Sequence, residues 1–145
     1  MTMRTINTII VHCSATKPSM DIGVETIRQW HMNKGWSDIG YHYVIRRNGV
    51  VELGRDLDKD GDVDEEIGAH AYGHNATSIG ICLIGGVDDS GKPDANFTLA
   101  QYNTLHTLTN RLHEKYFIKE VCGHRDLSGV SKACPSFNVK ELLNS

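Results

Sequence analysis

Three continuous apolar runs stand out from the polar background of this chain. Residues 8–13, TIIVHC, are rich in β-branched side chains and predict a buried strand that ends at His12. Residues 78–86, SIGICLIGG, predict a central strand that leaves through glycines, and residues 117–124, FIKEVCGH, predict a last strand that delivers His124 at its end. The apolar pattern therefore predicts a sheet with buried strands.

Other stretches show helical spacing or are interrupted by turn residues. Apolar positions recur at helical spacing over 23–34 and 98–116, which predicts two amphipathic helices, the second opening on a capping threonine. A short terminal helix is predicted near 138–144. The dipeptide Asn48-Gly49 lies between two extended runs and predicts a hairpin.

Strands mixed with two main helices predict an α/β fold, in which helices flank a central mixed β-sheet. The length of 145 residues suits one domain with a single sizeable core. The sequence shows no repeat, low-complexity tract or Pro/Ser-rich linker. We therefore expect one domain over residues 1–145.

Composition and charge exclude several classes of partner. Apolar residues make up 39% and charged residues 23%, as in soluble globular proteins, and the formal charge of -3 gives no broad attraction to nucleic acid or anionic lipid. The first apolar run, of about four residues, is too short for the core of a signal peptide or for a membrane span. We therefore expect a monomer that is synthesised in the cytoplasm without a signal peptide, binds no nucleic acid and does not insert into a membrane.

Two histidines and a cysteine stand where metal ligands are expected. His12 and His124 each lie where an apolar strand runs out into a polar loop, and Cys134 lies on the loop after the second. Zinc binds imidazole nitrogen and thiolate sulfur, and a catalytic zinc keeps a fourth position open. A closed four-ligand site that also recruits Cys13 or Cys122 is one alternative, because Cys122 and His124 would share a strand face. Packed histidines and thiols without a metal are the other alternative.

Five segments extend this picture over nearly the whole chain. They are VHCSATKPS (11–19), IRQWHMNKGWSDIGYHYVIRRNG (27–49), HNATSIGICLIGG (74–86), DANFTLAQ (94–101) and KACPSF (132–137). Together they closely resemble the zinc-dependent N-acetylmuramoyl-L-alanine amidases of the type 2 family, above all the phage lysozymes of the T-odd coliphages. The peptidoglycan recognition proteins share the fold of this family. The resemblance therefore implies a type 2 amidase fold.

The resemblance also implies a function and a set of site residues. Carried over by position, it makes His12, His124 and Cys134 the ligands of a Zn²⁺ cofactor. It makes Tyr41 and Lys132 the catalytic side chains beside the metal. The implied reaction is hydrolysis of the amide bond between N-acetylmuramic acid and L-alanine in peptidoglycan. The implied protein is a phage or prophage endolysin that acts on the bacterial cell wall.

Cys82 stands where many members of this family carry a glutamate, although the phage lysozyme branch resembles this chain in having a cysteine there. Without a dedicated carboxylate base, proton transfer falls either to Tyr41 or to the attacking water itself. Three further residues are candidates for lining the substrate groove, and each would also suit a polar loop or a strand edge: His42, His70 and Asn75.

The acidic segment 56–66 falls outside the resemblance and is interpreted as an insertion relative to the phage lysozymes. It begins like an EF-hand calcium loop, with alternating carboxylates followed by the turn-forming Gly61. The match fails at the twelfth position, where Ile67 replaces the bidentate glutamate, so Asp64 or Glu66 would have to close the shell. Repulsion among the carboxylates favours Ca²⁺ as a structural clamp over a solvated acidic loop. The candidate calcium ligands are Asp56, Asp58, Asp60, Asp62 and Glu66.

Two other functions compete with catalysis. A peptidoglycan recognition module would hold the glycopeptide without cutting it, but a pure binder has no need of three metal ligands beside Tyr41 and Lys132. A regulatory interaction with a polymerase is a further hypothesis, because the resembling phage enzymes are also known as polymerase inhibitors. We therefore expect a zinc amidase whose partner is peptidoglycan.

Overall fold

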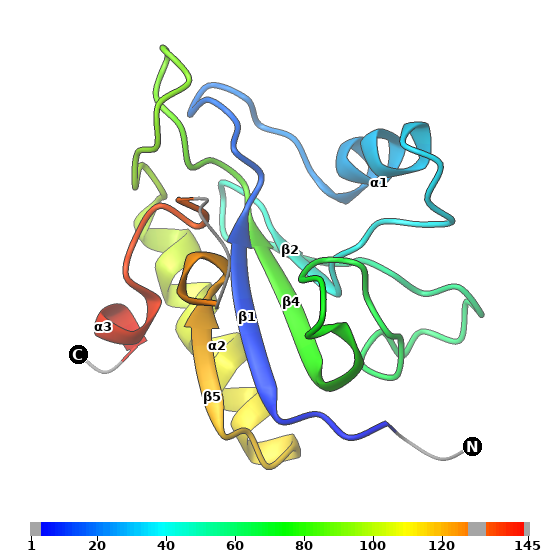
Figure 1. The fold of residues 1–145 in the computed structure, drawn as a ribbon. Helices are drawn as coiled ribbons and strands as arrows, with labels where there is room; N and C mark the ends of the chain where they lie inside the picture. Colours follow the sequence, from blue (N-terminus) through cyan, green and yellow to red (C-terminus); the bar gives the residue numbers. More distant parts are fainter. Residues whose placement is uncertain (1–3, 128–132, 144–145) are drawn as a thin grey trace.

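Figure 1 shows the computed structural model of the chain, which describes residues 4–127 and 133–143. Within these ranges a five-stranded sheet has the order β3-β2-β4-β1-β5. β1 pairs in parallel with β4 and β5, β4 pairs in parallel with β2, and β3 runs antiparallel to β2. The predicted mixed sheet and hairpin are confirmed. The strands are β1 (Thr8–Cys13), β2 (Tyr43–Ile45), β3 (Val51–Leu53), β4 (Ser78–Leu83) and β5 (Glu120–Gly123).

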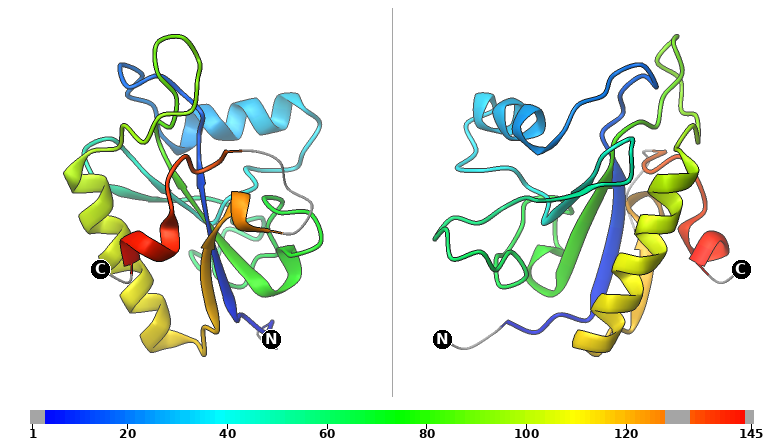
Figure 2. Two further views of the ribbon diagram at one scale, coloured as in Figure 1. Left: turned by 60° about the vertical axis from the view of Figure 1, so that its left-hand side comes forward. Right: turned by 180° about the vertical axis from the view of Figure 1, so that it is seen from behind.

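Helices cover both faces of the sheet (Figure 2). α2 and α3 pack on one face, and α1 lies over the other face together with the long connection between β3 and β4. None of the helices in the described ranges combines the length and the apolar character needed to cross a bilayer. The helices are α1 (Val24–Asn33), α2 (Leu99–Lys115) and α3 (Val139–Leu143), with two short 3-10 turns, η1 (Asn75–Thr77) and η2 (His124–Asp126).

A capping box starts α2, and the predicted capping threonine is Thr98. The Gln101 backbone N–H donates to Thr98 Oγ1 at 3.1 Å, and the Thr98 N–H donates to Gln101 Oε1 at 2.9 Å. The buried Gln101 amide also donates to the carbonyls of Ile84 at 2.8 Å and Ile45 at 3.2 Å. The start of the helix is therefore fixed to the carboxyl ends of β2 and β4.

The alternation of side chains along β1 divides the interior into two layers. Ile9 and Val11 join a core cluster that includes Leu105 of α2. Ile10 belongs to a separate cluster, and His12, two residues further along the strand, shares its face of the sheet. His12 thereby reaches the α1 side at the carboxyl end of a central strand, where open α/β sheets commonly bind ligands.

Two predicted strands are shorter than their apolar runs. β4 stops before Gly85, whose φ of 131° departs from the extended conformation. β5 stops at Gly123, whose N–H donates to Asp126 Oδ2 at 2.8 Å as the chain enters η2. His124 therefore opens a 3-10 turn instead of ending a strand, and the expectation that it shares a strand face with Cys122 is wrong.

Candidate metal centre

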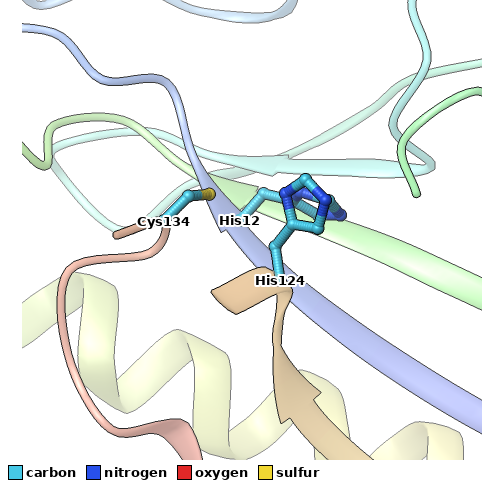
Figure 3. A group of neighbouring side chains, drawn as sticks. All are labelled: His12, His124 and Cys134. Atoms are coloured by element: carbon cyan, nitrogen blue, oxygen red, sulfur yellow. The ribbon is translucent and has the colours of Figure 1, made fainter. Parts of the chain in front are cut away.

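Three side chains from distant parts of the chain meet at the carboxyl end of β1 (Figure 3). His12 lies on β1 and is only 2% exposed, His124 opens η2, and Cys134 lies in the loop before α3. One ligand atom from each lies within 4.8 Å of the other two, and the two imidazole ring centroids are 4.6 Å apart. The Arg125 N–H donates to the Cys134 carbonyl at 2.7 Å and ties the two loops together. The structure thus brings together the three residues that the sequence selected.

The chemistry of this donor set fits zinc, which prefers imidazole nitrogen and thiolate sulfur. Among the described residues, neither Cys13 nor Cys122 joins the group. Cys122 packs with Ile10 and Ala71, whereas the backbone N–H of Cys13 donates to Cys134 Sγ at 3.1 Å. This part of the chain therefore offers three ligand atoms and not four, as an open site requires.

The protonation of Cys134 depends on the metal. In the metal-free chain, its hydrogen bond with Cys13 and its burial raise the pKa of the Cys134 thiol. A bound cation acts in the opposite direction because it stabilises the thiolate. Metal binding at this site should therefore release a proton and weaken as the pH falls.

Tyr41 lies beside these ligands, just before β2. Its ring centroid is 5.0 Å from that of His12, and its hydroxyl contacts the Cys82 thiol. Burial raises the pKa values of both the Tyr41 hydroxyl and the Cys82 thiol, so both are protonated at neutral pH. The flanking Gly40 holds this segment through its carbonyl, which accepts from the Ala69 N–H at 3.0 Å. Tyr41 therefore presents a hydrogen-bond donor next to the three ligands.

A cleft of about 530 Å³ opens above the three ligands and Tyr41. Its opposite wall comes from the end of α1 and the following turn, which contribute Trp30, His31, Lys34 and Trp36. Trp30 and Trp36 are 38% and 37% exposed, and the Lys34 ammonium lies 5.6 Å from the Trp36 ring centroid. Lys132, the second predicted catalytic side chain, lies outside the described residues.

This aromatic wall was not predicted from the sequence. Trp30 and His31 suit the apolar stripe of a helix, and the structure does bury His31, whose Nδ1 accepts from the Gly40 N–H at 2.9 Å. The available signal was that both tryptophans of the chain fall within a few residues of the predicted end of this helix, close to Gly35. Two half-exposed aromatic rings near a helix end suit a binding surface better than a core.

The three predicted groove residues have different placements. His70 lines the cleft, and its Nδ1 lies 2.8 Å from His12 Nε2. His42 is fully buried, between the Gly80 N–H at 2.9 Å and the Glu66 carbonyl at 2.6 Å, and it is not among the cleft-lining residues. Asn75 Oδ1 accepts from the backbone N–H groups of His70 and Ala71, each at 2.9 Å. Asn75 and His42 thus support the wall to which His70 belongs.

Carboxylates of the acidic segment converge in two overlapping groups. Asp58 belongs to both groups, and within each group the oxygens lie within 4.8 Å of one another. The neighbouring Asp60, partial burial and Asp58 raise the pKa of Glu65 to about 8. Glu65 is not among the calcium ligands predicted from the sequence. The Asp62 carboxylate instead accepts from the Asp64 N–H at 3.1 Å. The two groups are Asp56, Asp58 and Asp60, and Asp58, Glu65 and Glu66.

Asp64 turns away from these groups and anchors the segment to the body of the protein. The residue is 2% exposed, and its carboxylate accepts from the Tyr43 hydroxyl, from the Tyr116 hydroxyl at 2.7 Å and from Lys115 Nζ at 3.2 Å. Arg4 Nε also donates to the Asp64 carbonyl at 3.0 Å. Of the two residues suggested to close a calcium shell, Asp64 is therefore committed to the core and Glu66 remains near the ligand groups.

Comparisons with known proteins identify the family and the fold of this chain. The family model Amidase_2, N-acetylmuramoyl-L-alanine amidase, matches residues 2–137. The endolysin of Escherichia phage T7 is 51% identical over 132 residues, which cover 91% of this chain and 82% of the phage protein. The solved structure of N-acetylmuramoyl-L-alanine amidase LysC from Clostridium intestinale URNW matches with a TM-score of 0.78 at 28% identity. The match covers 96% of this chain and 83% of the LysC chain. The structure of Apis mellifera PGRP-SA, with a TM-score of 0.71, 23% identity and coverages of 100% and 89%, supports the fold alone.

Proposed function

This chain belongs to the N-acetylmuramoyl-L-alanine amidase family, and from that premise we propose that it hydrolyses the bond between N-acetylmuramic acid and L-alanine in peptidoglycan. Its similarity to phage endolysins supports a role in lysis of the bacterial cell wall. The observation that carries the proposal is the convergence of His12, His124 and Cys134 at the base of an open cleft.

The proposed cofactor is one Zn²⁺ ion held by His12, His124 and Cys134. When bound, zinc lowers the pKa of a water molecule to about 7 and withdraws charge from a carbonyl oxygen. The three residues would hold the ion, and therefore place the reaction, at the carboxyl end of β1. Burial of His12 on a central strand keeps the ligand geometry rigid.

Tyr41 and Lys132 are proposed to stabilise the oxygen of the cleaved amide as negative charge develops on it. The protonated Tyr41 hydroxyl can donate a hydrogen bond, and the Lys132 ammonium, assigned from the family resemblance, can add a positive charge. The buried, neutral Cys82 thiol beside Tyr41 cannot replace a carboxylate base. Proton transfer is therefore assigned to Tyr41, whose protonated hydroxyl can give a proton to the leaving amine nitrogen, or to the attacking water, which would release its proton to solvent.

The decisive experiment is release of new alanine α-amino groups from purified peptidoglycan. The protein should release amine, lose that activity after treatment with a chelator, and regain it when zinc is restored. A protein that binds intact cell wall but releases no amine at any zinc concentration would instead be a recognition module, and the catalytic proposal would be wrong.

The acidic segment 56–66 is proposed to bind Ca²⁺ as a structural clamp. Five carboxylates converge there, and none of the five belongs to an ion pair found in the described part of the chain: Asp56, Asp58, Asp60, Glu65 and Glu66. Hard carboxylate oxygens are the ligands that calcium prefers. Asp58 is the best residue to test because it belongs to both carboxylate groups.

Thermal unfolding of the chelator-treated protein tests the calcium proposal. Calcium at about 100 times its Kd should stabilise the fold by about 2.7 kcal/mol and raise Tm accordingly. Asp58→Asn should lose this shift, whereas Asp88→Asn, in a different loop, should keep it. An unchanged Tm in millimolar calcium would mean that the segment is only a solvated acidic loop.

A further inference from the structure

A chain of buried hydrogen bonds leads away from the metal centre behind His12. His12 Nε2 lies 2.8 Å from His70 Nδ1, and His70 Nε2 lies 3.2 Å from Ser78 Oγ. Ser78 Oγ in turn donates to the backbone carbonyl of His74 at 2.7 Å. Three side chains in succession therefore connect the strand β1 to a main-chain acceptor before β4.

The backbone carbonyl of His74, the last acceptor, determines the position of each proton in this series of hydrogen bonds. A carbonyl oxygen can only accept, so the single hydroxyl proton of Ser78 is directed to His74. Ser78 Oγ must then accept from His70 Nε2–H, and a neutral His70 ring therefore carries its lone pair on Nδ1. That lone pair accepts from His12 Nε2–H. The lone pair of a neutral His12 ring is thereby placed on Nδ1.

The surrounding backbone is shaped to hold the His70 ring. The side chain of His70 lies over Gly80 of β4, where a Cβ atom would come within 2.6–2.8 Å of three ring atoms. The backbone N–H of His70 is held by Asn75 Oδ1 at 2.9 Å. Ser78 is fully buried and His70 is 8% exposed, so water does not compete freely for these bonds. The ring therefore has one well-defined position.

We propose that His70 and Ser78 are positioning residues for the metal centre, which fix the tautomer of His12 so that Nδ1 is its metal-binding atom. The proposal rests on the zinc site of the proposed function and adds the two residues that orient one of its ligands. A ligating histidine whose second nitrogen donates to a fixed acceptor is held in one ring orientation and is a better ligand. His70 is thus assigned to the support of the metal site in addition to lining the cleft.

The tautomers can be read directly in the metal-free protein. Long-range ¹H–¹⁵N spectra of histidine side chains at neutral pH distinguish a proton on Nδ1 from one on Nε2, and His70→Gln identifies the signals of His70 and its neighbour. Both His12 and His70 should carry their proton on Nε2. A proton on Nδ1 of either ring would overturn the proposal, and the tautomers themselves are read in the parent protein without zinc.

Zinc affinity, measured by competition with a chromogenic chelator, tests the consequence. His70→Ala should weaken zinc binding about 10- to 100-fold, the range typical of lost outer-shell partners. Ser78→Ala should weaken it less, and His70→Gln should recover part of the loss, because its amide oxygen can still accept from His12. The matched control, His113→Ala, removes an exposed histidine of α2 and should bind zinc as the parent does.

The outcomes separate this inference from the zinc proposal. If the parent binds zinc and folded His70→Ala binds it equally well, the positioning role is overturned and the zinc site stands. If the parent binds no zinc, the zinc site itself is overturned, and the positioning role with it. Weaker binding by His70→Ala with the expected tautomers supports both.

Discussion

At the scale of single residues, the four cysteines of this chain show how surroundings decide chemistry. Cys13, Cys82 and Cys122 are buried, and Cys134 is partly exposed at the cleft. Spacing alone left both Cys122 and Cys134 as ligand candidates, because each lies near His124 in the sequence. The decision depends on the turn η2, which sends the chain after β5 towards the cleft and leaves Cys122 packed against Ile10.

Replacement of the two cysteines in parallel tests this distinction. Cys134→Ser should lose zinc and reduce amine release to the buffer background, because a serine hydroxyl is a poor substitute for a thiolate. Cys122→Ala should keep both zinc and activity. The measurements are zinc content after gel filtration and amine release from peptidoglycan. Equal zinc content in the two variants would argue against Cys134 as a ligand.

Tyr41→Phe removes one hydroxyl while the ring that packs near His12 remains. Loss of a donor to the developing oxyanion typically lowers turnover about 100- to 1000-fold. We expect a fall in kcat of this size with zinc content unchanged, measured by amine release under saturating substrate. A variant that kept its kcat but raised KM would show that Tyr41 only binds the substrate.

At the scale of elements, the sequence predicted the strands, both long helices and the cap of α2, because apolar period and capping chemistry are local properties. It did not predict the ends of β4 and β5, since these depend on a glycine conformation and on the side chain of Asp126. Nor did it reveal that Asp64, within an acidic run, is drawn inward by two tyrosines and a lysine. Contacts between residues so distant in the sequence cannot be predicted from the local pattern of apolar and polar positions.

Asp64 makes the docking of the acidic segment dependent on pH. Burial opposes its ionisation, but hydrogen bonds from Tyr43, Tyr116 and Lys115 outweigh burial and lower its pKa from 3.8. Its contribution to stability is therefore complete above about pH 4 and is lost as the pH falls through the lower folded pKa.

Asp64→Asn should lower the free energy of unfolding at pH 7 by about 3 kcal/mol, because bonds to a buried charge are lost. It should also flatten the fall in stability below pH 4. Urea denaturation between pH 7 and pH 2.5 measures both effects, with the exposed Glu114→Gln of α2 as the control. An unchanged acid profile would show that Asp64 does not hold the segment in place.

At the scale of the whole molecule, neutral buried histidines support the structure on the α1 side of the sheet. Burial lowers the pKa of His31 and that of His42 from 6.5 to about 4. The unfolded chain therefore binds more protons than the folded protein between pH 6.5 and pH 4. Stability should fall through this window as the pH decreases, by about 1.4 kcal/mol per pH unit for each fully titrating ring.

Urea denaturation of the metal-free protein at pH 7, 6, 5 and 4 measures this slope without a contribution from zinc binding. A flat profile over the window would mean that these rings titrate alike in the folded and unfolded states.

The position of β1 between β4 and β5 also has a consequence for synthesis. A ribosome makes His12 early, but β5, His124 and Cys134 follow only after nearly all of the remaining chain. At about 5–20 residues per second, the interval is on the order of ten seconds. On the proposed ligand assignment, a nascent or prematurely terminated chain has no complete metal site, so lytic activity would begin only after translation has passed Cys134.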